Sequence, residues 1–369
     1  NDTSKGKGVD ATQLDKNMAL NNSTDCDLKW FAPWEQPIYL AGFPWFPEDK
    51  AYCRLPVEPA YPIPAPVKTL SYCTAGGQMR FRTNSTKLEI DVELSAPANM
   101  YHMPATGQCG FDCYVSIPSG ELKYCGTTRC DHTQVKYRST LYENMEPEMR
   151  EVIINFPLYQ GVDDVRIGID NNAKIEGPTA YATDSKAIFY GTSITQGGCA
   201  SRPGMAYTNI LSRWLNMECI NLGFSGNGRG EPELAHIISE IENPACLILD
   251  YDSNCPSAEH LKVTLPDFIN IYRSVHKDVP ILVLYRIRYA SYNHNSQVRL
   301  ESSKRRKAQF ETVKEFKSKG DDNIYFVNGS TLMGDYFEEM TVDGVHPTDL
   351  GFFKMAEGLY PILKTILML

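Results

Sequence analysis

The feature that most limits the fold is a change of hydrophobic period at about residue 180 of this 369-residue chain. Beyond that point, short apolar runs of strand length alternate five times with longer stretches of helical spacing. This alternation is typical of a parallel sheet covered by helices on both faces, and we therefore predict an α/β domain over residues 181–369. The strand runs are residues 187–191, 217–223, 245–252, 279–287 and 323–329, and the helical stretches are residues 206–216, 231–242, 261–278, 296–320 and 350–369.

Residues 67–176 follow a different period, which is two. The run KLEIDVEL (87–94) alternates apolar and polar side chains, and similar runs at 134–142, 150–157 and 164–170 are separated by Gly, Pro and Asn turns. Short strands at this spacing predict an antiparallel, jelly-roll-like β-sandwich, which we assign to residues 29–180.

Two segments precede these strands. Residues 1–28 are polar and loosely patterned, which predicts a flexible lead-in. Residues 29–66 are rich in aromatic side chains and proline, and proline at this density excludes a regular helix or a central strand. We expect their Trp and Phe side chains to pack over another surface, with stacking on sugar rings as the alternative.

The net charge of −9 and the pI of about 5.4 argue against a non-specific nucleic-acid-binding protein, which needs a basic surface. The basic run 304–307 is expected on the solvated face of the helix 296–320, whose apolar face would be Phe310, Val313 and Phe316. No apolar run reaches the roughly 18 to 20 residues that span a bilayer, so we expect no membrane-spanning segment.

Eleven cysteines raise the question of a metal site or disulfides. The pairs in 109–113 and 125–130 are separated by three and four residues, with no CxxC pair and no histidine at zinc-finger spacing. We therefore expect no metal, and buried free thiols with one or two disulfides.

Ser193 follows the first strand of the α/β domain in the stretch AIFYGTSITQGG. A serine hydroxyl becomes a nucleophile only when a base accepts its proton, so a catalytic Ser193 needs a histidine that a carboxylate orients. Asp343 and His346 lie three apart in the loop TVDGVHPTDLGF, after the last strand and before the last helix. A carboxylate at that spacing can hold one imidazole nitrogen while the other faces Ser193 across the sheet edge. An Asp cap beside an incidental His is the competing interpretation.

Acyl transfer also needs hydrogen-bond donors for an oxyanion. Two further post-strand loops offer them: Gly226 in NLGFSGNG (221–228) supplies a backbone N–H, and Asn254 in LDYDSNCP (249–256) supplies a side-chain amide. The backbone N–H of Ser193 would be the third donor. Because ligands bind at the carboxyl ends of parallel strands, four such loops would meet at one edge.

The blocks GTSIT, NLGFSGNG, DYDSN and DGVHP, in this order, resemble the four blocks of the SGNH (GDSL-type) hydrolases. The resemblance implies a three-layer, flavodoxin-like α/β/α domain, with Ser193, His346 and Asp343 as the catalytic triad. It also implies Ser193, Gly226 and Asn254 as oxyanion donors, and no metal or organic cofactor. The sequence departs from the pattern at Thr192, where the family has Asp, and at Cys255, where an Asp is common.

The motif GFDCY (110–114) resembles the GxDLY motif of the sandwich domain that precedes some bacterial SGNH hydrolases, with Cys113 in place of Leu. The arrangement is similar to that of bacterial carbohydrate esterases, which implies a periplasmic or secreted protein. Asp112 and Tyr114 could then bind substrate at the rim of the active site. A structural turn is the alternative, because Asp in such a position often bonds its own backbone.

Together these features predict a serine esterase that removes small acyl groups, acetyl above all, from a small-molecule or glycan ester. One alternative is a non-catalytic glycan-binding protein on a degenerate hydrolase scaffold, which Thr192 and Cys255 favour and the complete Ser, His and Asp set disfavours. Lipase, thioesterase and acyltransferase activities are the others.

Overall fold

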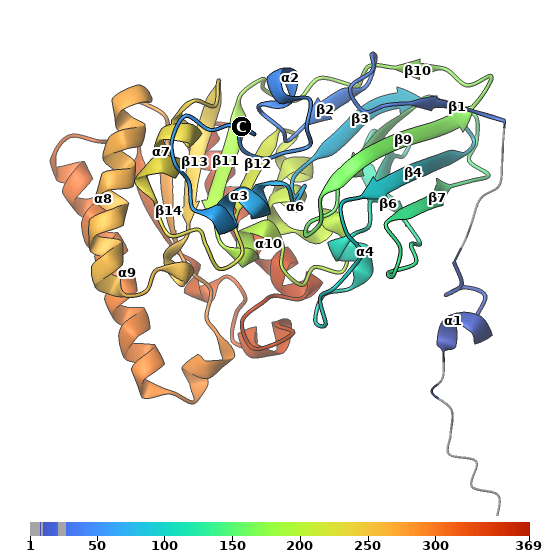
Figure 1. The fold of residues 1–369 in the computed structure, drawn as a ribbon. Coiled ribbons are helices and arrows are strands. Elements are labelled where there is room, and N and C mark those ends of the chain that lie inside the picture. The colour runs from blue at the N-terminus through green and yellow to red at the C-terminus, as the bar shows by residue number, and fades with distance from the viewer. Residues whose placement is uncertain (1–7, 9, 21–26) are drawn as a thin grey trace, which may run out of the picture.

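The computed structural model describes residue 8, residues 10–20 and residues 27–369. Two antiparallel sheets fill the N-terminal half and one parallel sheet the C-terminal half, which confirms the predicted fold class (Figure 1). Half of the predicted lead-in, residues 1–7, 9 and 21–26, lies outside the described residues. The described part of the lead-in forms the exposed four-residue helix α1 (Ala11–Leu14), and Leu28 already belongs to the first strand.

The N-terminal sandwich packs two antiparallel sheets face to face. The first has the order β1 (Leu28–Phe31), β9 (Val162–Asp170), β4 (Leu88–Leu94), β7 (Lys136–Tyr142). The second has the order β10 (Ile175–Glu176), β3 (Gln78–Thr83), β8 (Arg150–Asn155), β5 (Asp112–Ser116), β6 (Leu122–Thr127), and β2 (Tyr39–Ala41) pairs with β3.

The period-two pattern explains the sandwich core. Along β4, Leu88, Ile90, Val92 and Leu94 are all buried, because alternate side chains of a strand point to the same face. They pack with apolar side chains of β3 and β8 in one cluster, so the core lies between the two sheets.

The C-terminal sheet is parallel throughout and has the strand order β12 (Cys219–Gly223), β11 (Lys186–Gly191), β13 (Pro244–Asp250), β14 (Ile281–Tyr285), β15 (Ile324–Asn328). All of the predicted strand runs are present. β11 is the first strand of this sheet along the chain and lies between β12 and β13, so the loops after β12 and β13 flank the loop that carries Ser193.

Helices cover both faces of this sheet, which gives the three layers visible in Figure 1. Alternate side chains of β11 belong to different clusters: Phe189 packs with α6 (Tyr207–Leu215) and α10 (Asp349–Leu367). Tyr190 packs with α7 (Pro232–Ser239), α8 (Ala258–Val275) and α9 (Ser296–Ser318) on the opposite face.

The remaining helical segments are short turns in the connections. They are α2 (Phe46–Asp49), α3 (Ala65–Ser71), α4 (Ala105–Gln108), α5 (Ser193–Gln196), η1 (Pro203–Met205), η2 (Asp252–Asn254), η3 (Ala290–Asn293), η4 (Gly329–Thr331) and η5 (Phe337–Met340).

The aromatic and proline-rich segment 29–66 packs over both halves of the molecule, as its composition predicted. Phe43 belongs to the sandwich core and Leu55 to the α/β core. Between them, the fully buried Arg54 donates to the carbonyl oxygens of Asn221 (3.0 Å) and Gly223 (2.7 Å) on β12. The only strands in this segment are short, and β1 is an edge strand, because proline removes ladder hydrogen bonds.

Two details of α9 were predicted wrongly. Phe310 is exposed and touches the ring of Phe326 edge-on, whereas Val313 and Phe316 pack in the core as predicted, together with Ala308. Within the basic run 304–307, Arg305 is buried and donates to the carbonyl oxygen of Asp252 (2.6 Å). It therefore supports the loop after β13, while Lys304, Arg306 and Lys307 are exposed as predicted.

Every cysteine in the described part of the chain is a free thiol, and most of them are buried. The expected disulfides are therefore absent among these residues, and Cys26 lies outside them. A search of the described helices found none with the length and hydropathy of a membrane span.

Candidate active site

Ser193 lies where β11 meets α5. Thr192 caps this helix: its hydroxyl accepts from the N–H of Ile194 (3.3 Å), and its own N–H donates to Thr195 Oγ1 (3.3 Å). Thr192 therefore performs the capping that the family's Asp could perform, because Thr and Asp both accept from backbone N–H groups at a helix start. As the first helical residue, Ser193 has a backbone N–H with no acceptor inside the helix.

The buried carboxylate of Asp250 stabilises this turn. Asp250, the last residue of β13, accepts from Tyr207 Oη (2.8 Å) and Thr195 Oγ1 (3.2 Å). Loss of solvation on burial is the main cause that raises the pKa of Asp250 to about 7, and the two hydroxyl donors oppose it. The turn that carries Ser193 is thus fixed by side chains that are themselves fully enclosed.

His346 and Asp343 lie in the loop before α10 and complete a chain of hydrogen bonds with Ser193. Ser193 Oγ is 2.9 Å from His346 Nε2, and His346 Nδ1 is 2.6 Å from Asp343 Oδ2. The β-bridge between Thr341 and Pro347 holds this loop in place. Ser193 and His346, 153 positions apart in the sequence, therefore meet at one edge of the sheet. The side chains of His346 and Asp343 are 23% and 25% exposed, which leaves the chain reachable from solvent.

Both carboxylate oxygens of Asp343 accept hydrogen bonds within its own loop. Its Oδ1 accepts from the N–H groups of His346 (2.8 Å) and Val345 (3.0 Å). Partial burial raises the pKa of Asp343, but the hydrogen bonds from His346 and Val345 outweigh it, so the net pKa is below its usual value. The carboxylate is therefore ionised at neutral pH and can fix the orientation and tautomer of the imidazole.

The two predicted oxyanion donors lie in the loops on either side of the Ser193 loop. Gly226 follows β12 with φ of +70°, a conformation that glycine adopts without strain. Asn254 ends η2 after β13, and its amide is 3.4 Å from the carbonyl oxygen of Phe224. Ser225 N–H donates to Gln196 Oε1 (3.0 Å), which joins the loop after β12 to α5.

The sandwich contributes contacts that the sequence did not reveal. Tyr159 donates from its hydroxyl to the carbonyl oxygen of Ser193 (3.1 Å), and His102 Nε2 is 3.8 Å from Asp343 Oδ2. The ring of His102 meets that of His346 edge-on at 5.7 Å and stacks on the exposed Tyr101 at 4.4 Å. The sequence around His102 gave no signal of this role, because its neighbours form neither a motif nor a periodic pattern.

Cys199 also lies close to these groups, in the loop after α5. It is 3% exposed, and burial, followed by the charge of Asp343, raises its pKa to about 12, so the side chain is a neutral thiol. Nearby, Gly198 lets the loop pass the serine: a Cβ there would lie 3.0 Å from the carbonyl oxygen of Ser193 and 2.8 Å from Tyr159 Oη.

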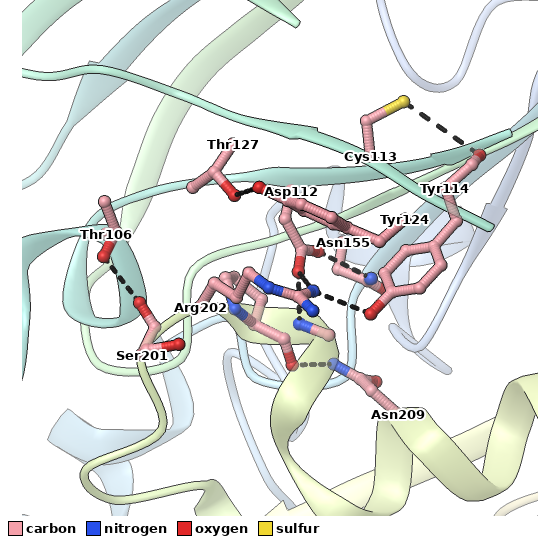
Figure 2. A network of polar contacts seen from close by, with 12 residues as sticks. Thr106, Asp112, Cys113, Tyr114, Tyr124, Thr127, Asn155, Ser201, Arg202 and Asn209 are labelled. Carbon is pink, nitrogen blue, oxygen red and sulfur yellow. Dashed lines mark hydrogen bonds and ion pairs between the residues drawn. The ribbon is translucent and has the colours of Figure 1, made fainter. Parts of the chain in front are cut away.

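Asp112 and Tyr114 are not in the catalytic chain but in a buried cluster between the two domains (Figure 2). Asp112 Oδ2 accepts from Arg202 Nη1 (2.8 Å) and the N–H of Gly204 (2.8 Å), and its Oδ1 accepts from Asn155 (2.8 Å). Tyr114 Oη is 2.7 Å from Arg202 Nη1. With no exposed surface on Asp112, this geometry favours the structural alternative over substrate binding, through contacts to residues 201–204 rather than to its own backbone.

The structure joins a β-sandwich to a parallel α/β domain that carries a hydroxyl–imidazole–carboxylate chain at the carboxyl edge of its sheet. These features indicate an ester hydrolase. Comparison with family models agrees: residues 184–364 match the GDSL-like lipase/acylhydrolase family, and residues 28–175 match the GxDLY domain found at the N-terminus of SGNH-hydrolase-type esterases. The chain belongs to the GDSL-like lipase/acylhydrolase family and carries a GxDLY domain, and it is an ester hydrolase.

Solved structures support this assignment. A protein from Bacteroides ovatus named as a GDSL-like lipase is 30% identical, with a TM-score of 0.84 over 92% of this chain and 98% of its own. The salicylyl-acyltransferase SsfX3 of a tetracycline biosynthetic pathway is 18% identical, with a TM-score of 0.72 over 90% and 96%. A family two carbohydrate esterase from Cellvibrio japonicus is 13% identical, with a TM-score of 0.59 over 92% and 98%. The last two show the fold alone, and no curated protein matched the chain.

Proposed function

We propose that the protein removes small acyl groups, acetyl above all, from carbohydrate esters, with Ser193 as nucleophile, His346 as general base and Asp343 as its orienting carboxylate. The observation that carries the proposal is the continuous chain from Ser193 Oγ through His346 to Asp343, with contacts of 2.9 and 2.6 Å. Those lengths are within hydrogen-bond reach of the proton transfers that acyl transfer requires.

The reaction has two steps. Ser193 Oγ attacks the ester carbonyl carbon while His346 Nε2 takes the hydroxyl proton, and Asp343 stabilises the imidazolium that forms. The imidazolium returns the proton to the leaving alcohol, which departs and leaves an acyl-serine. A water molecule, activated by His346, then attacks the acyl carbon, releases the acid and restores the serine.

The negative oxygen of each tetrahedral intermediate needs donors. The backbone N–H of Ser193, the backbone N–H of Gly226 and the amide of Asn254 are assigned to this role. Their loops follow three adjacent strands, β12, β11 and β13, and an Asn254 amide whose 3.4 Å contact to Phe224 is long can turn toward a stronger acceptor.

Two observations support a small acyl group on a sugar. Ser193 is only 9% exposed, which favours a small acyl group over a long chain. The sandwich places the almost fully exposed ring of Tyr101 against His102, beside the catalytic chain, and an exposed aromatic face can pack against a sugar ring. Structures of similar fold include family two carbohydrate esterases, one of them in complex with cellohexaose.

The test is a comparison of acyl chains on one leaving group. Turnover of p-nitrophenyl acetate should exceed that of p-nitrophenyl octanoate, and acetate should be released from an acetylated oligosaccharide. A preference for octanoate would favour a lipase or thioesterase instead. Transfer of the acetyl group to an added sugar alcohol, in place of acetate release, would favour an acyltransferase, the activity named for SsfX3.

A further inference from the structure

Three donor atoms of the kinds that bind zinc meet beside the catalytic chain. One atom each of His102, Cys199 and His346, either an imidazole nitrogen or the thiol sulfur, all lie within 4.8 Å of one another. Imidazole and thiolate are the ligands that zinc prefers in proteins. The described residues hold no other group of three or more such side chains at this spacing.

The three side chains come from different parts of the chain. His102 belongs to the sandwich, in the connection between β4 and α4, whereas Cys199 follows α5 and His346 precedes α10. The His102 and His346 side chains are 17% and 23% exposed, so an ion can reach the cluster from their side while Cys199 lies at its inner end.

Two features of these residues have no use in ester hydrolysis. Nδ1 of His102 is buried and has no hydrogen-bond partner among the described residues. Cys199 has φ of +77°, a conformation that a residue with a Cβ adopts only at a cost, and its buried thiol lies within 4.8 Å of one nitrogen of each histidine. The unpaired buried nitrogen of His102, beside two further zinc-binding side chains, points to a ligand at this place.

We propose that His102, Cys199 and His346 form a zinc site at the junction of the two domains, and that a bound Zn²⁺ ion holds the enzyme inactive. Ligand atoms of a tetrahedral zinc ion lie roughly 3.3 to 3.8 Å apart, so shifts of about 1 Å suffice to close the site. The fourth position is open to water or to Asp343, whose Oδ2 is 3.8 Å from His102 Nε2.

Coordination and catalysis exclude each other at His346. Both of its nitrogens are in use, Nε2 toward Ser193 and Nδ1 toward Asp343, so an ion that binds either nitrogen breaks the chain. The thiol of Cys199 loses its proton to solvent when its sulfur binds the ion, because the thiolate is the metal ligand. The inhibition rests on the proposed function, whereas the binding does not.

The direct test is a titration of the chelator-treated protein with Zn²⁺ followed by calorimetry, and with Co²⁺ followed by absorption. We expect one ion per chain and a thiolate-to-cobalt charge-transfer band. Loss of an outer-shell partner alone costs about 10- to 100-fold in metal affinity, so Cys199→Ser and His102→Gln should each weaken binding at least as much. Cys130→Ser, which alters a partly buried thiol of the sandwich, should bind as the wild type does.

The esterase assay gives the second readout. Zn²⁺ should inhibit wild-type turnover reversibly, and Cys199→Ser should keep the zinc-free rate while its inhibition constant rises about tenfold or more. Unchanged metal affinity in Cys199→Ser, or a cobalt band that persists in it, would overturn the site. Zinc binding without any ester turnover would count against the proposed function alone, and turnover without zinc binding against this site alone.

Discussion

Two polar clusters lie on either side of the loop after α5, and they differ in how completely their groups are used. In the first, Ser193, His346 and Asp343 are linked end to end, and the side chains of His346 and Asp343 are 23% and 25% exposed. In the second, Asp112 has no exposed surface. Its Oδ1 accepts from Asn155 of the sandwich, and its Oδ2 accepts from Arg202 and Gly204 of the α/β domain.

This difference indicates that the first cluster is suited to catalysis and the second to holding the two domains together. A nucleophile must be reachable, and its partners must be able to exchange protons, so an open chain with an exposed edge is suited to catalysis. A charge with no exposed surface, whose two oxygens both accept hydrogen bonds, instead fixes what surrounds it, because breaking any of these bonds leaves a buried group unpaired. The GFDCY motif therefore joins the sandwich to residues 201–204, in the segment that follows Ser193.

The largest effect should come from Ser193→Ala. Removal of the nucleophile should lower kcat for p-nitrophenyl acetate by on the order of 10⁴- to 10⁶-fold, with the free energy of unfolding almost unchanged. Ser239→Ala serves as the control, since this buried serine of α7 bonds the carbonyl oxygen of Ala235, far from the site in sequence. A Ser193→Ala enzyme that retains a tenth of the wild-type rate would contradict the assignment of the first cluster to catalysis.

Asp112→Asn should show the opposite behaviour. The groups around Asp112, from Asn155, Arg202 and Gly204, all donate hydrogen bonds to it. The NH₂ group of an asparagine would therefore face a donor whichever way the amide turned, and at least one of these hydrogen bonds would be lost. Breaking a buried pair of this kind costs about 3 to 5 kcal/mol, which denaturant unfolding would measure, while kcat should change less than about tenfold. Asp131→Asn, at a partly exposed aspartate, is the control, and a destabilisation no larger than in that control would contradict the assigned role.

Asn254→Ala tests the oxyanion assignment at the edge of the first cluster. Loss of one donor should reduce kcat by on the order of 10²- to 10³-fold, or about 2.7 to 4 kcal/mol, with little change in KM. Asn323→Ala removes a comparable amide that bonds the carbonyl oxygen of Asp278, away from the active site. A loss below about fivefold in Asn254→Ala would remove this residue from the donors.

The smallest effect concerns Asp250, which is buried like Asp112 but has no cation beside it. Its pKa is raised to about 7 in the folded protein, so its contribution to stability is complete below the unfolded pKa of 3.8 and is lost as the pH rises toward 7. Asparagine does not titrate. The stability of Asp250→Asn relative to wild type should therefore increase by about 1 kcal/mol or more between about pH 5 and pH 8. A difference that does not depend on pH would show that Asp250 stays ionised throughout.

The sequence predicted best what depends on local pattern. The parallel strands, the helix faces and the loops after the strands all followed from periodicity, because buried faces repeat along an element. Even there Phe310 was misplaced, since a helix that is partly covered leaves some apolar positions exposed. Ser193, His346 and Asp343 could be proposed together because each follows or precedes an element that ends at the same sheet edge.

Contacts between the domains could not be predicted. The sequence around His102 contains no motif, yet His102 lies against Asp343, and no local pattern marks Arg202, which bonds Asp112 and Tyr114. Nothing in a single sequence states how the sandwich rests on the α/β domain, so residues whose partners lie across that junction carry no local signal.

The most direct measurement is the identification of the residue that a fluorophosphonate probe labels, by mass spectrometry of peptides from the native protein. The account predicts one adduct, on Ser193, that is absent in Ser193→Ala and slowed strongly in His346→Gln. An adduct on a different serine, or ester turnover by a protein whose Ser193 never reacts, would contradict it.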